Sequence, residues 1–198
     1  MKIIKVKPDS LADKIGLKSG DHLLKINGKR VIDEIDYKFR MTEERLLLDL
    51  EINGQMERVE VEKEYDDHLG VEFEEMKIRG CANDCVFCFV DQNPPNMRDS
   101  MYFRDGDYRM SYLHGHYITM TNMGQNELKR IVEQRLSPLY ISIHVTDPEL
   151  RQELFLYKRD DNLLGKIQYL TENNIELHTQ IVLMPTINDN QHLLHTLN

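Results

Sequence analysis

Three cysteines, the only ones among 198 residues, lie in one eight-residue window, Cys81-Ala-Asn-Asp-Cys85-Val-Phe-Cys88. Thiolates this close together on one loop can hold iron or zinc while leaving the coordination of the metal incomplete. An odd number of cysteines also leaves one thiol over in any disulfide pairing. The spacing therefore predicts a metal site with an open position, at which chemistry can take place.

The composition places this loop in an ordinary globular chain, with 40% hydrophobic and 30% charged residues. No apolar stretch approaches the roughly 18 residues needed to cross a bilayer, and residues 1–7 alternate too strongly for a signal peptide. We therefore expect a cytoplasmic protein that does not enter membranes and whose thiols stay reduced. The net charge of -9 argues against nucleic-acid binding, because phosphate contacts need clustered Lys and Arg.

Residues 1–76 have the pattern of a small β-rich domain. An Asn-Gly pair joins two apolar runs twice, at Asn27-Gly28 and at Asn53-Gly54, and each pair predicts a hairpin because both residue types tolerate positive φ. Short helices are expected up to Ile15, where residues 8–10 offer caps, and over residues 33–45.

This first segment resembles a PDZ domain, on residues 8–12 (PDSLA), 16–17 (GL), 20–24 (GDHLL) and 26–28 (ING). The resemblance implies peptide binding by β-augmentation, with a peptide C-terminus as partner. PDZ domains ordinarily place a carboxylate-binding loop before this region, whereas here residues 69–73 (LGVEF) have that character. Two interpretations are open, a circularly permuted domain or a plain connecting strand, and docking within the chain is a further alternative to peptide binding.

The cysteine loop has three competing interpretations. A ferredoxin-type electron carrier would need a fourth cysteine, which the chain lacks. A structural zinc site could take His68, His114 or His116 as its fourth ligand. The third interpretation is a catalytic iron–sulfur site.

The third interpretation comes from a resemblance to the radical S-adenosylmethionine superfamily. Its signature is Cys-x3-Cys-x-aromatic-Cys, and Cys81, Cys85, Phe87 and Cys88 fill every position. The resemblance implies a 4Fe–4S cluster on the three cysteines, with S-adenosylmethionine on the unligated iron and Phe87 near its adenine. Reductive cleavage of that cofactor would start radical chemistry, with electrons supplied by a donor such as flavodoxin or ferredoxin.

The remainder of the chain fits an α/β fold, with residues 77–198 forming a partial (β/α) barrel of parallel strands. Strands are expected over 72–79, 116–121, 139–145 and 175–183, and helices over 125–135, from Pro148, and over 162–172. Polar residues within the last three strands share one parity, which is typical of strands that line a polar lumen. These residues are Thr119, Thr121, Ser142, His144, His178 and Gln180.

Superfamily members bind the methionine amino group after the second strand, commonly through Gly-Gly-Glu, where this chain has residues 119–123 (TMTNM). The resemblance makes Thr121 and Asn122 candidate cofactor ligands, and Ser142 and Gln180 join them from the ends of later strands. The long loop 91–112 is interpreted either as a solvated connection or as a lid over the cluster.

Residues 81–92, 108–115, 141–144 and 182–189 resemble the bacterial proteins that join a PDZ domain, a radical S-adenosylmethionine domain and domain of unknown function 512. Only four barrel strands are expected here, so we expect an N-terminal fragment of such a protein. Two functions follow: a radical enzyme of unknown substrate, or a non-catalytic binding module whose cysteine loop holds a structural metal.

Overall fold

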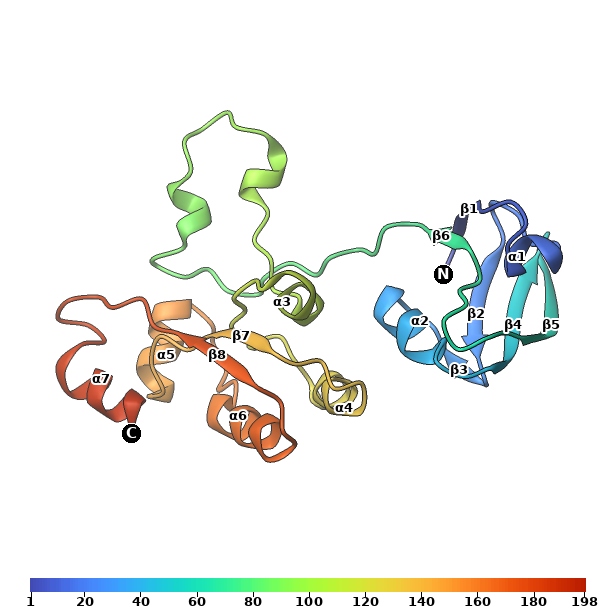
Figure 1. The fold of residues 1–198 in the computed structure, drawn as a ribbon. Helices are drawn as coiled ribbons and strands as arrows, with labels where there is room; N and C mark the ends of the chain where they lie inside the picture. The colour runs from blue at the N-terminus through green and yellow to red at the C-terminus, as the bar shows by residue number, and fades with distance from the viewer. The chain divides into compact units, whose positions relative to one another are not determined.

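The computed structural model describes residues 1–198 and divides into two compact units, Met1–Lys77 (unit 1) and Ile78–Asn198 (unit 2). Each unit has its own secondary structure, as the ribbon shows (Figure 1). The two units are described one after the other.

Unit 1 is a β-rich domain with two short helices (Figure 1). Strands β2, β3, β4 and β5 form an antiparallel sheet in the order β3-β2-β4-β5, and β1 pairs with β6. Apolar side chains of the sheet and of α1 and α2 form one core, which includes Ile3, Leu23 and Leu48. The elements are β1 (Ile3–Val6), α1 (Leu11–Lys14), β2 (His22–Ile26), β3 (Lys29–Arg30), α2 (Glu34–Arg40), β4 (Arg45–Ile52), β5 (Gln55–Glu62) and β6 (Val71–Phe73).

The local signals predicted these elements correctly. Asn27 and Gly28 have φ values of 49° and 75°, as the β2–β3 hairpin requires. The side chain of Ser10 caps α1, and that of Asp33 caps α2. Helix α2 ends at Arg40, five residues before the expected boundary at residue 45. The chain is already in strand β4 at Arg45 and needs the residues between to turn.

Unit 2 alternates helices with a small parallel sheet (Figure 1). Strands β7 and β8 pair in parallel, and Ile118 adds one isolated parallel bridge to Ile141. The fold is therefore mixed α/β. The elements are the 3-10 turns η1 (Phe89–Gln92) and η2 (Asp99–Tyr102), then α3 (Tyr108–His114), α4 (Gln125–Glu133), β7 (Leu139–Ser142), α5 (Pro148–Phe155), α6 (Leu163–Glu172), β8 (Leu177–Gln180) and α7 (Asn190–Leu197).

The structure shows only this two-stranded parallel sheet and not the expected barrel. The strand expected over 72–79 is regular only at β6, which belongs to unit 1. The strand expected over 116–121 is reduced to the Ile118 bridge. Its end is irregular because Met120 has a φ of 58° and because side chains, rather than a neighbouring strand, bind the carbonyls that follow Ile118.

The prediction missed a helix in the loop 91–112, where α3 begins at Tyr108. The side chain of Asp107 caps α3, and Gly115 ends it with a φ of 72°. Both are ordinary boundary signals. The helix holds the loop to the sheet, because the buried Ser111 hydroxyl exchanges hydrogen bonds with the carbonyl and amide of Tyr140.

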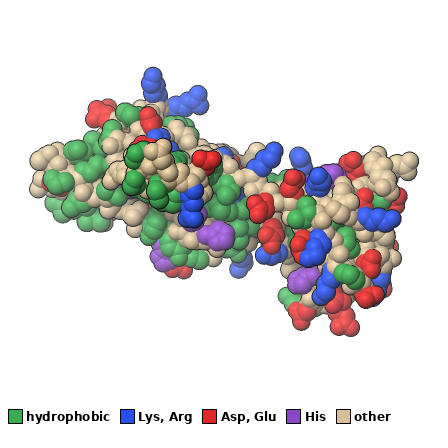
Figure 2. All heavy atoms as spheres, turned by 90° about the horizontal axis from the view of Figure 1, so that it is seen from above, with side chains coloured by type: hydrophobic (Ala, Val, Ile, Leu, Met, Phe, Trp, Pro, Cys, Tyr) green, Lys and Arg blue, Asp and Glu red, His purple; other side chains and the backbone are tan.

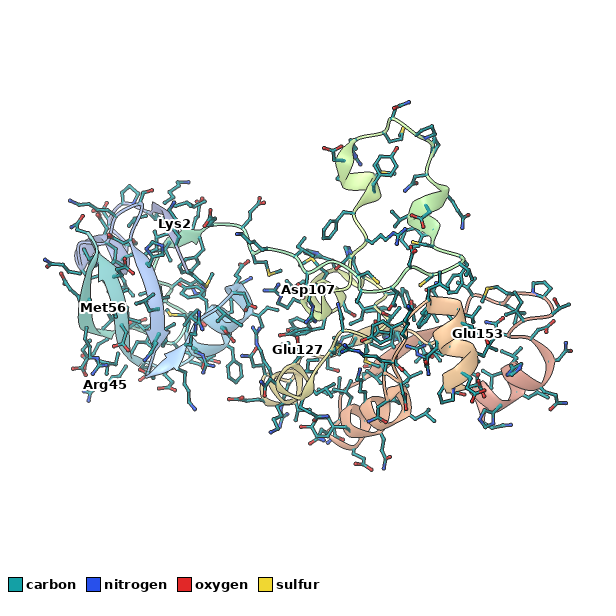
Figure 3. The ribbon with its side chains drawn as sticks, turned by 180° about the vertical axis from the view of Figure 1, so that it is seen from behind. Lys2, Arg45, Met56, Asp107, Glu127 and Glu153 are labelled. Atoms are coloured by element: carbon teal, nitrogen blue, oxygen red, sulfur yellow. The ribbon has the colours of Figure 1, made fainter.

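The surface of unit 2 carries exposed apolar side chains near the cysteine loop. Val86, Phe89 and Met97 are 62%, 78% and 48% exposed, and hydrophobic atoms are prominent on the face of unit 2 seen in Figure 2. The side chains that fill both units are drawn in Figure 3. None of the helices combines the length and the apolar character needed to span a membrane.

Candidate iron–sulfur site

The cysteine loop, residues 81–88, is fixed to the end of helix α5. The amides of Asp84 and Val86 donate to the carbonyls of Phe155 and Leu154 at 3.0 and 3.1 Å. Carbonyls in the last turn of a helix have no partner within the helix. The loop satisfies two of them, and its central part is thereby held against α5.

The beginning of the loop is held by the segment before α3. The Cys81 amide donates to the carbonyl of Arg104 at 2.7 Å. Gly106 packs so closely that an added Cβ would lie 2.7 Å from the Cys81 Cα and 3.1 Å from Asn122 Nδ2. Only glycine fits there, so Gly106 is a site residue that the sequence patterns did not reveal.

The three thiols are each partly exposed and none is in a disulfide. Burial, followed by the negative charges of Cys81 and Cys88, raises the pKa of Cys85 to about 12. The charges of Cys81 and Cys88 thus act on Cys85, which lies between them in the loop. No group of three or more His, Cys, Asp or Glu side chains, the cysteines included, is arranged to hold a metal ion. By donor chemistry the residues fit an iron–sulfur cluster, for which three thiolates are suitable ligands.

Arg104 places a positive charge beside these thiols. Its guanidinium donates to Asp84 at 2.7 Å and to both carboxylate oxygens of Asp91 at 2.6 Å. These hydrogen bonds raise the pKa of Arg104, and the negative charge of Cys88 adds to the effect. A cation at this position partly offsets the negative charge of clustered thiolates.

A second cation, Arg151, is buried below the loop on α5. It pairs with Asp161 at 2.9 Å and donates to the carbonyl of Thr119 at 2.8 Å and to that of Ile143. Burial lowers the pKa of Arg151, and Asp161 opposes that effect. Arg151 thus binds the backbone just beyond the Ile118 bridge and just beyond β7, and it ties these two chain segments together.

Two further side chains bind the same backbone. Lys166 of α6 donates to the carbonyl of Met120 at 2.6 Å, and the Tyr157 hydroxyl donates to the carbonyl of Thr121 at 3.1 Å. With Arg151, they hold three consecutive carbonyls, those of residues 119–121. The predicted cofactor ligand Thr121 therefore lies on rigid backbone, and its own hydroxyl donates to Asn83 Oδ1 at 2.8 Å.

Phe87 lies in an aromatic cluster with His144 and Phe155. Its ring centroid is 4.8 Å from that of His144 and 6.2 Å from that of Phe155. His144 Nδ1 accepts a hydrogen bond from the Val182 amide at 3.0 Å, so the neutral ring carries its proton on Nε2. Burial, with the charge of Arg151 as a smaller cause, lowers the pKa of His144 to about 4.

Asn188, which no sequence pattern singled out, holds this cluster in place. Its buried amide nitrogen donates to the carbonyls of His144 and Val182 at 2.9 Å each, and its Oδ1 accepts from the Met184 amide at 2.7 Å. An asparagine after a strand has no distinctive pattern, so no sequence signal pointed to this role.

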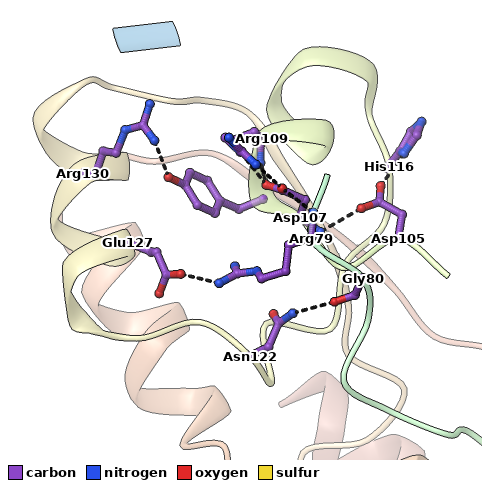
Figure 4. A network of polar contacts seen from close by, with 10 residues as sticks. Arg79, Gly80, Asp105, Asp107, Arg109, His116, Asn122, Glu127 and Arg130 are labelled. Atoms are coloured by element: carbon purple, nitrogen blue, oxygen red, sulfur yellow. Dashed lines mark hydrogen bonds and ion pairs between the residues drawn. The ribbon is translucent and has the colours of Figure 1, made fainter. Parts of the chain in front are cut away.

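The other predicted residues differ in their surroundings. Asn122 Nδ2 donates to the carbonyl of Gly80 at 3.3 Å, next to Cys81 (Figure 4). Ser142 is buried at the end of β7. Gln180 is exposed, and its carbonyl accepts from the amides of Ile143 and His144. The structure thus brings Thr121 and Asn122 to the cysteine loop, and it brings Phe87 to the end of β7.

A polar network borders the entry to the loop (Figure 4). Arg79 pairs with Glu127 of α4, and its amide donates to Asp107 at 2.9 Å. His116, one of the possible zinc ligands, instead pairs with Asp105 at 2.6 Å. The network anchors the segment that leads into Cys81.

The family comparison identifies unit 2. Residues 63–198, more than half of the chain, match the family model described as a radical SAM-like domain. The chain belongs to the radical SAM-like family. Residues 2–55 match the PDZ domain model, so the architecture is a PDZ domain followed by a radical SAM-like domain. No curated protein matches the sequence.

In this radical SAM-like chain the PDZ match covers β1 to β4 of unit 1, but neither β5 beyond Gln55 nor the segment 69–73. That segment forms β6 at the edge of unit 1, antiparallel to β1. The ring of Tyr37 on α2 contacts Phe73 at 4.9 Å, and the Leu69 amide donates to the Tyr37 hydroxyl at 3.3 Å. The Leu69 amide is therefore already hydrogen-bonded within unit 1.

Proposed function

We propose that the chain is a radical S-adenosylmethionine enzyme whose Cys81, Cys85 and Cys88 hold a 4Fe–4S cluster. The main support is the three-cysteine loop, which is held by α5 and by the segment before α3 in a chain of the radical SAM-like family. When bound, the cluster and S-adenosylmethionine supply a 5′-deoxyadenosyl radical that abstracts hydrogen from a substrate.

The residues around the loop have supporting roles. Arg104 and Arg151 offset the negative charge of the thiolates, and both interact electrostatically with the cysteines. Phe87 lies beside His144 and Phe155, and it offers an aromatic face for the adenine ring. The neutral His144 offers a hydrogen-bond donor at Nε2.

Five residues are proposed to border the cofactor. Phe87 lies within the cysteine loop, Asn122 donates to the carbonyl of Gly80 just before it, and Thr121 donates to Asn83 inside it. Ser142 and Gln180 mark the ends of the parallel strands β7 and β8, where ligands of such sheets bind.

The wider proposal retains the expected organisation. Residues 1–76 act as a peptide-binding PDZ-like domain, and residues 77–198 act as part of a (β/α) barrel of the kind found in proteins with domain of unknown function 512. Support comes from the two compact units and the two family matches. A small electron-transfer protein such as flavodoxin or ferredoxin reduces the cluster, and the reducing cytoplasm suits its thiols.

Anaerobic reconstitution with iron and sulfide tests the proposal. We expect about four irons per wild-type chain and a reduced-cluster electron paramagnetic resonance spectrum that changes when S-adenosylmethionine is added. Replacing any one ligand, as in Cys85→Ser, removes most of the bound iron. The matched control is Val86→Ala in the same loop, whose exposed side chain leaves the iron content unchanged.

The alternative function is a non-catalytic module, in which the PDZ domain recruits a partner and the loop holds a structural metal. The PDZ match favours a binding role for unit 1. Tight binding of one zinc, with no spectral response to S-adenosylmethionine, would contradict the enzyme proposal and support the module.

A further inference from the structure

A closed ring of three hydrogen bonds joins the cysteine loop to the backbone after Ile118. Asn83 Nδ2 donates to Thr119 Oγ1 at 2.9 Å, and Thr121 Oγ1 donates to Asn83 Oδ1 at 2.8 Å. The two hydroxyl oxygens are 3.0 Å apart. Because Thr119 accepts from the amide and Thr121 donates to it, the Thr119 hydroxyl must donate to Thr121. Each of the three groups thus donates once and accepts once within the ring.

The ring is largely buried and connects the cysteine loop to the backbone of residues 119–121. Asn83 and Thr121 are 5% and 6% exposed, so their polar groups need partners within the protein. Asn83 lies between Cys81 and Cys85. The two threonines lie on backbone whose carbonyls are held by Arg151, Lys166 and Tyr157.

We propose that Asn83, Thr119 and Thr121 are positioning residues. Their hydrogen bonds hold the cysteine loop in a fixed position relative to the backbone of residues 119–121. This inference rests on the proposed function for its catalytic meaning. The Thr121 hydroxyl is used within the ring, so Thr121 acts on the cofactor site through Asn83 and not through a hydroxyl contact of its own. Asn122, which follows it, remains the side chain that reaches the entry of the loop.

Hydrogen–deuterium exchange of the metal-free chain tests the positioning role directly. Thr119→Val and Thr121→Val keep the side-chain shape but remove one ring member each. We expect the amides of Asp84 and Val86 to exchange about tenfold faster in both variants, because each leaves a buried polar group without its partner. Thr119→Ser and Thr121→Ser retain the hydroxyl and restore slow exchange.

Two further variants keep this test decisive. Thr171→Val removes an exposed hydroxyl that bonds only within α6, and it leaves loop exchange unchanged. If a valine variant unfolds unit 2, so that the α6 amides also exchange freely, Asn83→Asp is used instead. A carboxylate keeps the shape of Asn83 but cannot donate to Thr119. Exchange at Asp84 and Val86 that matches the wild type in this variant would overturn the inference.

The reconstituted chain provides the second readout. Both valine variants are expected to bind iron through the three cysteines but to lose at least half of the spectral change caused by S-adenosylmethionine, and the serine variants recover it. The spectral change could instead be lost in Thr121→Val alone, while the amides of Asp84 and Val86 exchange at the wild-type rate. Thr121 would then be a direct cofactor ligand, and the inference of a positioning ring would be wrong. If the wild type binds no iron, the proposed function fails, while the exchange data still decide whether the ring positions the loop.

Discussion

The two units solve the same problem, the burial of polar groups, in different ways. In unit 1 the buried carboxylates of Asp33 and Asp36 bind amides only three or four residues away, at Asp36 and Ile32. In unit 2 the buried side chains of Arg151, Asn188 and Lys166 each bind a carbonyl that lies 32, 44 or 46 residues away. Unit 1 also has two long-range contacts, because the side chains of Asp21 and Tyr37 each accept from an amide 32 residues away. Unit 2 differs in that its long-range contacts converge on the segments around the cysteine loop and join them.

This difference has a functional meaning. Long-range hydrogen bonds in a low-dielectric interior specify one arrangement, because each lost partner leaves a costly unsatisfied group. A cofactor site needs such a defined arrangement, while a peptide-binding domain can rely on a sheet and an apolar core. The comparison predicts that polar substitutions are more damaging in unit 2 than in unit 1.

The largest effect is expected for Arg151→Met. The change leaves Asp161 without its cation and the carbonyls of Thr119 and Ile143 without a donor. Breaking a buried ion pair by removing one partner costs about 3–5 kcal/mol, so the free energy of opening of unit 2 should fall by that amount. Native-state hydrogen exchange of the β7 amides measures the change, with the β4 amides of unit 1 as an internal reference.

The matched control for this prediction is Arg159→Met, which removes an exposed arginine and should change the opening free energy by less than about 0.5 kcal/mol. Equal effects of Arg151→Met and Arg159→Met would mean that the long-range contacts of Arg151 contribute little, and the comparison between the units would lose its basis.

The same difference explains what the sequence could predict. Hairpins at Asn27 and Asn53, and the cap at Ser10, depend on neighbours in the chain, so their patterns are visible in the sequence. The cysteine spacing is also local. Arg151 and Asn188 have no such pattern, because each also binds a carbonyl far away in the sequence, at a separation of 32 and 44 residues respectively.

The missing barrel strand has a related cause. Alternation over residues 116–121 predicted a strand, but that pattern shows only which side chains are apolar. It does not show that Lys166 and Tyr157 bind the carbonyls of Met120 and Thr121. Such tertiary contacts override a local preference for strand structure. Helix α3, in contrast, was missed although Asp107 and Gly115 marked its ends.

An intermediate effect, dependent on pH, is expected at Asp107. Burial opposes its ionisation, but hydrogen bonds from the Arg109 side chain and from the amides of Arg79 and Arg109 lower the pKa of Asp107 overall. A carboxyl whose folded-state pKa is lowered stabilises the fold above its unfolded pKa of about 4, and this contribution is lost as the pH falls through the lower value. Asp107→Asn should therefore cost about 2 kcal/mol at pH 7.

Thermal or denaturant unfolding of unit 2 at several pH values checks this prediction. The difference between wild type and Asp107→Asn should shrink steadily as the pH falls below about 4, because the wild-type carboxyl then becomes protonated. A difference that stays constant down to acid pH would show that the negative charge of Asp107 does not stabilise the fold. Asp107 caps a helix locally and also accepts from the amide of Arg79, 28 residues before it. It therefore combines the local role seen in unit 1 with the long-range role seen in unit 2.

The smallest effect is expected for the local cap Asp33→Ala in unit 1. Asp33 is 1% exposed, and its carboxylate accepts from the Asp36 amide at 3.0 Å. Loss of such a cap costs about 1 kcal/mol, which corresponds to about fivefold faster exchange of the α2 amides. Asp33→Asn keeps an oxygen that can accept this hydrogen bond, so it should restore most of the protection. If Asp33→Ala opened the whole sheet of unit 1 as strongly as Arg151→Met opens unit 2, buried polar groups would be equally critical in both units. The contrast drawn from their sequence separations would then be wrong.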